Sequence, residues 1–179
     1  ETKFFKNKKI KIRKLSKKDL RNASKFQDFF NSLVAERAPI LANKKISFKQ
    51  QVRRLKGLLK KIRENKCVCL IAEEDNKIIG QTVIFLLEGK QEHIGQFVVS
   101  IRKENRGMGL GNYLMKNIII LAGEELKPKP RIIRLSVFST NKPALNLYKK
   151  YGFKKVAKVP KQFKHKGKLV DEIIMILYL

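Results

Sequence analysis

The feature that most constrains this chain is a run of three glycines that leads directly into an apolar helical segment. The stretch is NRGMGLGNYLMKNIIILAG, residues 105–123. Glycine lets the backbone take positive φ and lets a ligand approach the main chain without meeting a Cβ. Main-chain N–H groups at a helix start have no partner within the helix and lie at the positive end of its dipole. A plain tight turn explains one glycine but not three, so the stretch predicts a phosphate-binding site.

Two common phosphate-binding loops do not fit this spacing. The dinucleotide fingerprint is Gly-x-Gly-x-x-Gly with an acidic residue about twenty positions further on. Here the three glycines alternate with single residues, and the next predicted strand carries Arg131 and Arg134 instead of an acid. A Walker A loop also needs Gly-Lys-Ser/Thr, which does not follow. The phosphate ligand therefore belongs to another class.

The pattern of apolar residues predicts strands and helices on both sides of this loop. Alternation and short apolar runs predict strands over residues 9–15, 67–73, 77–87, 93–101, 131–138, 153–159 and 169–179. Helical spacing predicts helices over 17–36, after a cap at Ser47, from the glycines to about residue 125, and over 142–151. The predicted order is strand, two helices, three strands, helix, strand, helix and two strands.

Length and composition favour one domain. With 179 residues, of which 43% are apolar, the chain can bury one substantial core. Its apolar runs stop after about five residues, far short of the roughly twenty needed to cross a bilayer. The Lys-rich start lacks the apolar centre of a secretion signal. These features predict a cytoplasmic protein without a membrane span.

The two cysteines are expected to be core thiols. Cys67 and Cys69 stand two apart in an apolar run, which puts both on one face of a strand. A redox or metal pair is the less favoured interpretation. The sequence predicts no disulfide framework and no metal site.

The net charge is unusual. With 42 Lys and Arg against 15 Asp and Glu, the chain carries a formal charge of +27. Such a field attracts polyanions and disfavours cationic partners. The basic residues are spread along the chain, so most are expected to cover solvated surface. Nucleic acid stays open as a partner.

Residues 106–111 spell R-x-x-G-x-G, which resembles the acetyl-CoA signature of the Gcn5-related N-acetyltransferases (GNAT). A second segment, IIRLSVFSTNKPALNLYKKYGFKKV, resembles that superfamily's strand, Asn-capped helix and closing Tyr-Gly-Phe. The resemblance covers essentially the whole chain. Through HIGQFVVS and LVDEIIMIL the chain is most similar to small bacterial and archaeal members of the amino-acid and phosphinothricin type.

The resemblance implies an α/β GNAT fold for residues 1–179 as a single N-acetyltransferase domain. The fold is a mixed, twisted sheet of about seven strands with about four helices. Its fourth and fifth strands, here residues 93–101 and 131–138, splay apart and leave a cleft for the pantetheine arm of coenzyme A. Nearby lysines are expected at the ADP 3′-phosphate, although the sequence does not choose one.

The resemblance also implies the cofactor-binding residues. Main-chain groups of Val98, Val99 and Ser100 would hold pantetheine. The pyrophosphate would lie on the main-chain amides of Arg106, Gly107, Met108, Gly109, Leu110 and Gly111. Asn141 matches the family's asparagine, and it is expected both to contact the cofactor and to cap the helix that follows.

Tyr148 is the predicted catalytic residue. Seven residues after Asn141, it matches the family's tyrosine, whose hydroxyl would protonate the departing thiolate; a buried core tyrosine is the structural alternative. A phenol with a pKa of about 10 suits a thiol leaving group because it stays protonated at neutral pH. A neutral amine would attack the acetyl carbonyl directly, and strand amides near Val99 would stabilise the oxyanion.

The general base is not assigned by the sequence. Some relatives use a glutamate on the fourth or fifth strand, whereas the matching neighbourhoods here hold Gln96 and Ser136. An amide cannot accept a proton in this role. Glu92 or His93, through water, or an amine that arrives already neutral, are the remaining alternatives.

The charge shapes the expected substrate. We expect a small amine that bears a carboxylate, such as an amino acid, bound between the first two helices and the last two strands. A protein N-terminus on the ribosome is the next alternative, because a basic surface attracts rRNA. A non-catalytic nucleic-acid-binding module on the same fold is the third. The sequence leaves the oligomeric state open and is compatible with a homodimer.

Overall fold

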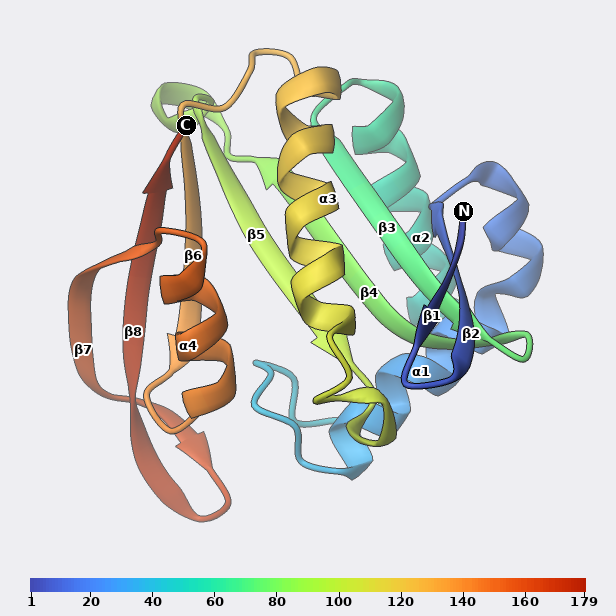
Figure 1. Ribbon diagram of the computed structural model, residues 1–179, viewed down its shortest axis with the longest axis horizontal. Coiled ribbons are helices and arrows are strands. Elements are labelled where there is room, and N and C mark those ends of the chain that lie inside the picture. The colour runs from blue at the N-terminus through green and yellow to red at the C-terminus, as the bar shows by residue number, and fades with distance from the viewer.

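The computed structural model describes residues 1–179 and contains one eight-stranded mixed sheet (Figure 1). Its strands are β1 Thr2–Phe5, β2 Lys8–Lys14, β3 Cys67–Glu74, β4 Lys77–Leu86, β5 Ile94–Ile101, β6 Ile132–Phe138, β7 Lys154–His165 and β8 Lys168–Tyr178. The spatial order is β1-β2-β3-β4-β5-β6-β8-β7. Every neighbouring pair is antiparallel except β5 and β6, which are parallel.

Four α-helices cover the two faces of the sheet. They are α1 Ala23–Ala35, α2 Phe48–Arg63, α3 Leu110–Glu125 and α4 Lys142–Lys150. Helices α1 and α2 pack on one face through a cluster that contains Phe26, Leu33 and Leu55. Helices α3 and α4 cover the other face through a larger cluster that contains Leu114, Ile118 and Tyr148. Figure 1 shows α3 and α4 in front of the sheet, with α1 and α2 behind it.

The predicted element order is confirmed, with three corrections. The sheet has eight strands instead of about seven, because Thr2–Phe5 pairs with Lys8–Lys14 as an additional edge hairpin. The helix predicted over 17–36 is divided into a 3-10 turn, Lys17–Asn22, and α1. Strand β7 extends to His165 instead of ending near residue 159, because a bulge accommodates Pro160 within the ladder to β8.

Strand β7 forms one edge of the sheet and is rich in lysine. Its sequence KKVAKVPKQFKH carries five lysines and one proline over 12 residues. Its inner side pairs with β8, and no strand lies beyond it. The lysines along this edge are exposed.

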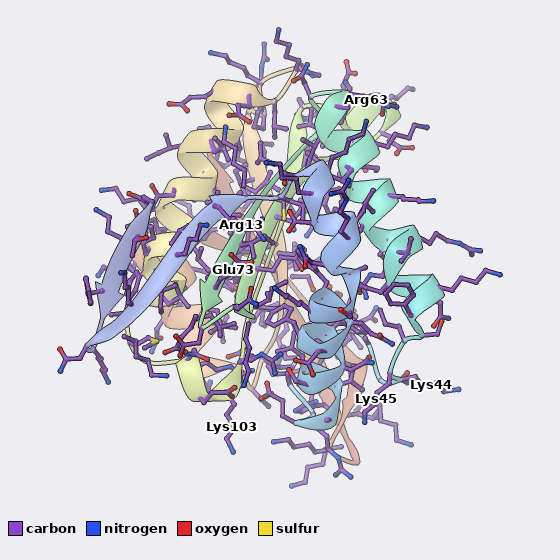
Figure 2. All side chains as sticks on the ribbon, turned by 90° about the vertical axis from the view of Figure 1, so that its right-hand side faces the viewer. Arg13, Lys44, Lys45, Arg63, Glu73 and Lys103 are labelled. Atoms are coloured by element: carbon purple, nitrogen blue, oxygen red, sulfur yellow. The ribbon has the colours of Figure 1, made fainter.

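A forked ion-pair network joins β2, β3 and the turn before α1. The Arg13 guanidinium donates to both carboxylate oxygens of Asp19, at 2.7 and 2.8 Å, and to both of Glu73, at 2.6 and 2.9 Å. Figure 2 shows Arg13 and Glu73 directed toward each other. Asp19 is buried, and this bidentate pairing satisfies its charge within the fold.

The cysteines are core residues, as predicted. Cys67 and Cys69 are buried in the cluster under α1 and α2 and are not bonded to each other. Burial raises the pKa of both thiols to about 12, so both are protonated at neutral pH. The chain holds no group of three or more His, Cys, Asp or Glu side chains that could bind a metal ion.

The excess of basic side chains lies on the surface. Exposed lysines and arginines project from the outer side of α2 and from the segments beside it, among them Lys44, Lys45 and Arg63 (Figure 2). None of the helices is long and apolar enough to cross a membrane.

The parallel strands β5 and β6 pair over only three residues. Ile94, Gly95 and Gln96 pair with Ile132, Ile133 and Arg134, and the ladder then ends although both strands continue. The contact is closest at Gly95, where a Cβ would lie 2.8 Å from Ile84 Cγ2 and 3.0 Å from Ile133 Cδ1. In Figure 1 the two strands diverge away from this point. The predicted splay is therefore present, and Gly95 lies at its closed end.

We predict that Gly95→Ala lowers the free energy of unfolding by about 1–3 kcal/mol, because the added methyl overpacks the junction of β4, β5 and β6. Urea unfolding measures the change. Gly123→Ala is the matched control: its Cβ would meet nothing within 4 Å, and alanine in a helix stabilises by about 1 kcal/mol. A Gly95→Ala variant as stable as the wild type would show that the junction is not tightly packed.

Candidate active site

The glycine loop presents a row of free main-chain donors at the start of α3. Gly107 and Gly109 take positive φ, at 71° and 92°, and Gly109 is the residue that caps the helix. The first helical bond runs from Tyr113 N–H to Gly109 C=O. The six N–H groups from Gly107 to Asn112 donate to no other group of the protein. A Cβ at Gly107 would meet nothing within 4 Å, so the space over the loop is open.

The segment before these donors is held in place by carboxylates. The Arg106 N–H donates to Lys103 C=O at 3.2 Å, so this one amide of the predicted set is used by the fold. The Arg106 guanidinium donates to Ile101 C=O at 2.8 Å and pairs with Glu36. Asn105 Nδ2 donates to Glu74 at 2.8 Å. The loop is therefore preorganised by contacts to α1 and β3.

Strand register selects Val99 among the three residues predicted on β5. Bonds from Leu87 N–H to Ile94 C=O and from Arg102 N–H to Ile79 C=O fix the alternation of the β4–β5 ladder. The main-chain groups of Val98 and Ser100 consequently point to β4. Those of Val99 point to the β6 side, where the ladder has already ended.

Helix α4 begins at the same end of the split as α3 (Figure 1). Asn141 caps it: its Oδ1 accepts from Ala144 N–H at 3.4 Å, and its Nδ2 has no protein partner. A pocket of about 560 Å³ brings Arg106 and Asn141 together. Its other lining residues include Lys103, Thr140 and Lys168. The structure thus places the glycine loop, the split and the Asn141 cap side by side.

Tyr148 lies on α4 against the end of the parallel ladder. Its ring packs edge-on against Phe97 of β5, at 6.0 Å between centroids, and also contacts Phe153. The residue is only 7% exposed, yet its hydroxyl has no hydrogen-bond partner and is not sealed from solvent. Burial raises the pKa of Tyr148 to about 12. The side chain is thus a packed core residue whose free hydroxyl remains a proton donor at neutral pH.

A second pocket, of about 580 Å³, lies between the end of α1 and the β7–β8 hairpin. Its apolar lining includes Ile40, Leu41 and Phe138, and Phe163 stacks on Phe138 at 4.3 Å. Its polar lining is largely basic, with Arg37, Lys164, His165 and Lys166 beside the neutral Asn43 and Gln162. Burial, together with the nearby Lys166, lowers the pKa of His165. This pocket occupies the region between the first two helices and the last two strands, where the acceptor was expected.

Sequence reasoning missed one carboxylate at the split. Ser136, two residues beyond the last paired residue of β6, donates its hydroxyl to Glu172 of β8. The two residues lie far apart in the chain, and only the β6–β8 register brings them together. Glu92 and His93 lie instead at the closed end of the split, where the His93 carbonyl accepts from Arg131 and Ile132 N–H.

Comparison with known proteins shows the family of this chain. The model of the acetyltransferase (GNAT) family matches residues 30–153. The chain belongs to this family. An L-amino acid N-acetyltransferase, AaaT, of Escherichia coli is 28% identical over 107 residues, which cover 59% of this chain and 65% of that protein. The match thus spans less than two thirds of that relative's length.

Two solved structures share the fold. A GNAT-family acetyltransferase from Streptococcus pneumoniae is 25% identical, with a TM-score of 0.82 over 95% of this chain and 99% of that one. The protein yncA from Salmonella typhimurium, solved with its cofactor acetyl-CoA, is 20% identical, with a TM-score of 0.77 over 95% of this chain and 94% of that one. The GNAT fold predicted from the sequence is confirmed.

We predict that Tyr148→Phe makes stability less sensitive to alkaline pH. The folded-state pKa of about 12 lies above the ordinary value of 10.0, so the folded protein holds this proton more tightly. The contribution is complete below about pH 10 and is lost as the pH rises through about 12. Urea unfolding near pH 8 and near pH 11 should show a wild-type decrease larger by about 1 kcal/mol. Equal decreases in both proteins would contradict this burial of the phenol.

Proposed function

We propose that this chain is an N-acetyltransferase that transfers acetyl from acetyl-CoA directly to the primary amine of a small, carboxylate-bearing molecule such as an amino acid. Residues 1–179 would form the single catalytic domain. The observation that carries the proposal is the row of six free N–H groups at the start of α3, which opens beside the parting strands β5 and β6. The amino-acid specificity of the Escherichia coli relative supports the substrate class.

The free amides suit a diphosphate. Each N–H from Gly107 to Asn112 is an unused donor at the positive end of a helix of 16 residues. A pantetheine arm running from this loop into the split would meet the free main-chain groups of Val99 on one side. Asn141 Nδ2 is a spare donor on the other side. The strong positive charge of the chain favours binding of an anionic carrier of this kind.

Tyr148 is suited to the acid role. Its hydroxyl has no competing partner, and burial keeps it protonated well above neutral pH. As the acetyl carbon–sulfur bond breaks, this hydroxyl would donate its proton to the departing thiolate. Main-chain N–H groups at the split, that of Val99 foremost, would stabilise the oxyanion of the tetrahedral intermediate.

The pocket between α1 and the β7–β8 hairpin is suited to an amino acid. Its apolar wall of Ile40, Leu41 and Phe138 favours an apolar side chain. Its basic rim, which includes Arg37, favours a carboxylate. An amine without a carboxylate would leave this basic rim without an anionic partner.

We predict that acetyl-CoA raises the melting temperature of the wild type and that Gly109→Ala weakens coenzyme A binding by about tenfold. A Cβ at φ 92° strains the loop by about 1–3 kcal/mol and misdirects its amides. Isothermal titration calorimetry with coenzyme A measures the affinity. Gly89→Ala is the matched control: its φ is also positive, at 62°, but it lies in the β4–β5 connection, so affinity should not change.

A different pair of results would overturn the proposed function. If acetyl-CoA leaves the melting temperature unchanged while RNA binds with a steep salt dependence, the chain is a nucleic-acid-binding module on this fold. If coenzyme A binds, thiol release from acetyl-CoA over a panel of L-amino acids, polyamines and peptides identifies the acceptor class.

We predict that Tyr148→Phe lowers kcat by about 10²–10⁴-fold and leaves coenzyme A affinity within about twofold, because it removes only the proton donor. Steady-state thiol release and calorimetry measure the two effects. Tyr151→Phe is the control on the same helix end, since its hydroxyl already donates to Asn112 C=O at 2.9 Å. Turnover unchanged by Tyr148→Phe would remove Tyr148 from the acid role.

A further inference from the structure

We propose that Glu172, acting with Ser136, binds the ammonium group of the acceptor and takes its proton. This inference rests on the proposed function and supplies the general base that the sequence leaves unassigned. Ser136 would touch the amine, and Glu172 would act as the proton sink through the serine hydroxyl. The pair lies at the open part of the split, two residues past the last parallel pair, Gln96 with Arg134.

The first observation is that Glu172 has no cationic partner in a chain full of cations. Nine of the 15 acidic residues form ion pairs with Lys or Arg. Of the other six, Glu64, Asp75, Glu92, Glu104 and Glu124 are exposed to solvent. Glu172 alone is partly buried, and its only protein partner is the Ser136 hydroxyl. A partly buried carboxylate without a counter-charge suits a bound cation.

The second observation is that Ser136 and Glu172 lie on the face of the sheet opposite the cluster under α3 and α4. Leu135 and Val137 point into the cluster under α3 and α4, so Ser136 between them points to the opposite face. Phe138, on that same opposite face, lines the proposed acceptor pocket and is the register partner of Glu172. The carboxylate is therefore next to the pocket, on the side from which the acceptor would approach.

The third observation is that the proposed acid and base lie on opposite sides of the opening. Tyr148 belongs to the cluster under α3 and α4, whereas Ser136 and Glu172 lie on the other face. The strands are not paired here, so the sheet does not separate the two faces. This arrangement suits attack from one face and departure of the thiolate toward the other.

Ser136, Glu172 and Tyr148 would carry out the proton transfers of the reaction. The ammonium gives one proton to Ser136 Oγ while the Ser136 hydroxyl proton moves to Glu172, which leaves a neutral amine. The amine nitrogen attacks the acetyl carbon, and the carbon–sulfur bond then breaks as Tyr148 protonates the sulfur. The amide nitrogen returns a proton to the Tyr148 phenolate. Glu172 releases its proton to solvent, so the net products are the amide, the free thiol and one proton.

The charged and titratable neighbours of Glu172 on this face are Arg134, Lys154 and His165. Arg134 and Lys154 are register partners of Ile176, four residues or about 13 Å along the strand from Glu172. His165 is nearer, because its ring packs edge-on against Phe138, the register partner of Glu172, at 5.3 Å between centroids. From the α1 side, Arg37 lines the acceptor pocket. None of these groups forms an ion pair with Glu172.

We predict that Glu172→Gln, which keeps an acceptor for the Ser136 hydroxyl but removes the charge, lowers kcat/KM for L-leucine by at least about 10²-fold near pH 7. The loss should shrink about tenfold per pH unit toward the pKa of the amine, because solvent then supplies the neutral nucleophile. A second readout needs no turnover: calorimetry should show weaker binding of L-leucine to the complex with coenzyme A. Ser136→Ala, which keeps the charge of Glu172, should lower kcat by a larger factor than it weakens L-leucine binding.

Glu64→Gln is the matched control, because Glu64 also lacks an ion-pair partner but is exposed at the end of α2. It should change neither turnover nor binding. Coenzyme A affinity serves as the folding check for every variant. If the wild type turns over and Glu172→Gln is unaffected, or loses activity equally at every pH, the inference is wrong while the proposed function stands. If the wild type does not bind coenzyme A, the proposed function itself fails.

Discussion

The structure depends on one incomplete pairing, the three-residue parallel ladder between β5 and β6. Elsewhere in the sheet, antiparallel ladders consume the main-chain groups of each strand. Strands β5 and β6, in contrast, pair only around Gly95 and then diverge, so the main-chain groups of Val99 have no ladder partner on the β6 side. The same parting lets α3 and α4 begin side by side at one end of the molecule (Figure 1). A buried main chain without partners is costly, which is why such an opening suits a ligand that supplies them.

Most charged side chains belong to one of two groups, exposed cations on the surface and ion-paired carboxylates within the fold. Most cations are exposed and surround the molecule with a positive field. Inside the fold, carboxylates such as Asp19, Glu36 and Glu74 are each committed to an arginine or lysine and serve to hold strands and loops. Glu172 belongs to neither group, because it is partly buried and forms no ion pair. A local negative site within a positive field is what a zwitterionic acceptor requires, because its two charges need opposite surroundings.

Local patterns predicted much of the fold and part of the site. The glycine loop, the Asn141 cap and the position of Tyr148 follow from residues close together in the chain, because helix starts are specified locally. The Cys67 and Cys69 core positions follow from strand alternation. Strand β1 was missed because four residues of mixed character carry no clear period.

Features that depend on register could not be predicted in this way. Which of Val98, Val99 and Ser100 turns its main chain to the split is decided by the hydrogen-bond phase of the β4–β5 ladder. The pairing of Ser136 with Glu172 is decided by the β6–β8 register, across 36 residues of chain. The use of the Arg106 amide by Lys103 depends on a 3-10 turn that the sequence pattern does not announce. Strand register thus decides which groups are available at the site, and local sequence motifs do not specify that register.

The lysine-rich outer strand has a consequence for how copies of this protein meet. An unpaired strand is a template for a neighbouring chain to extend the sheet. Along β7, a second copy would bring like charges opposite one another, and the backbone hydrogen bonds would be interrupted at Pro160 and at Lys161, where φ is 54°. Charge repulsion and the interrupted hydrogen bonds therefore disfavour pairing of two copies along β7.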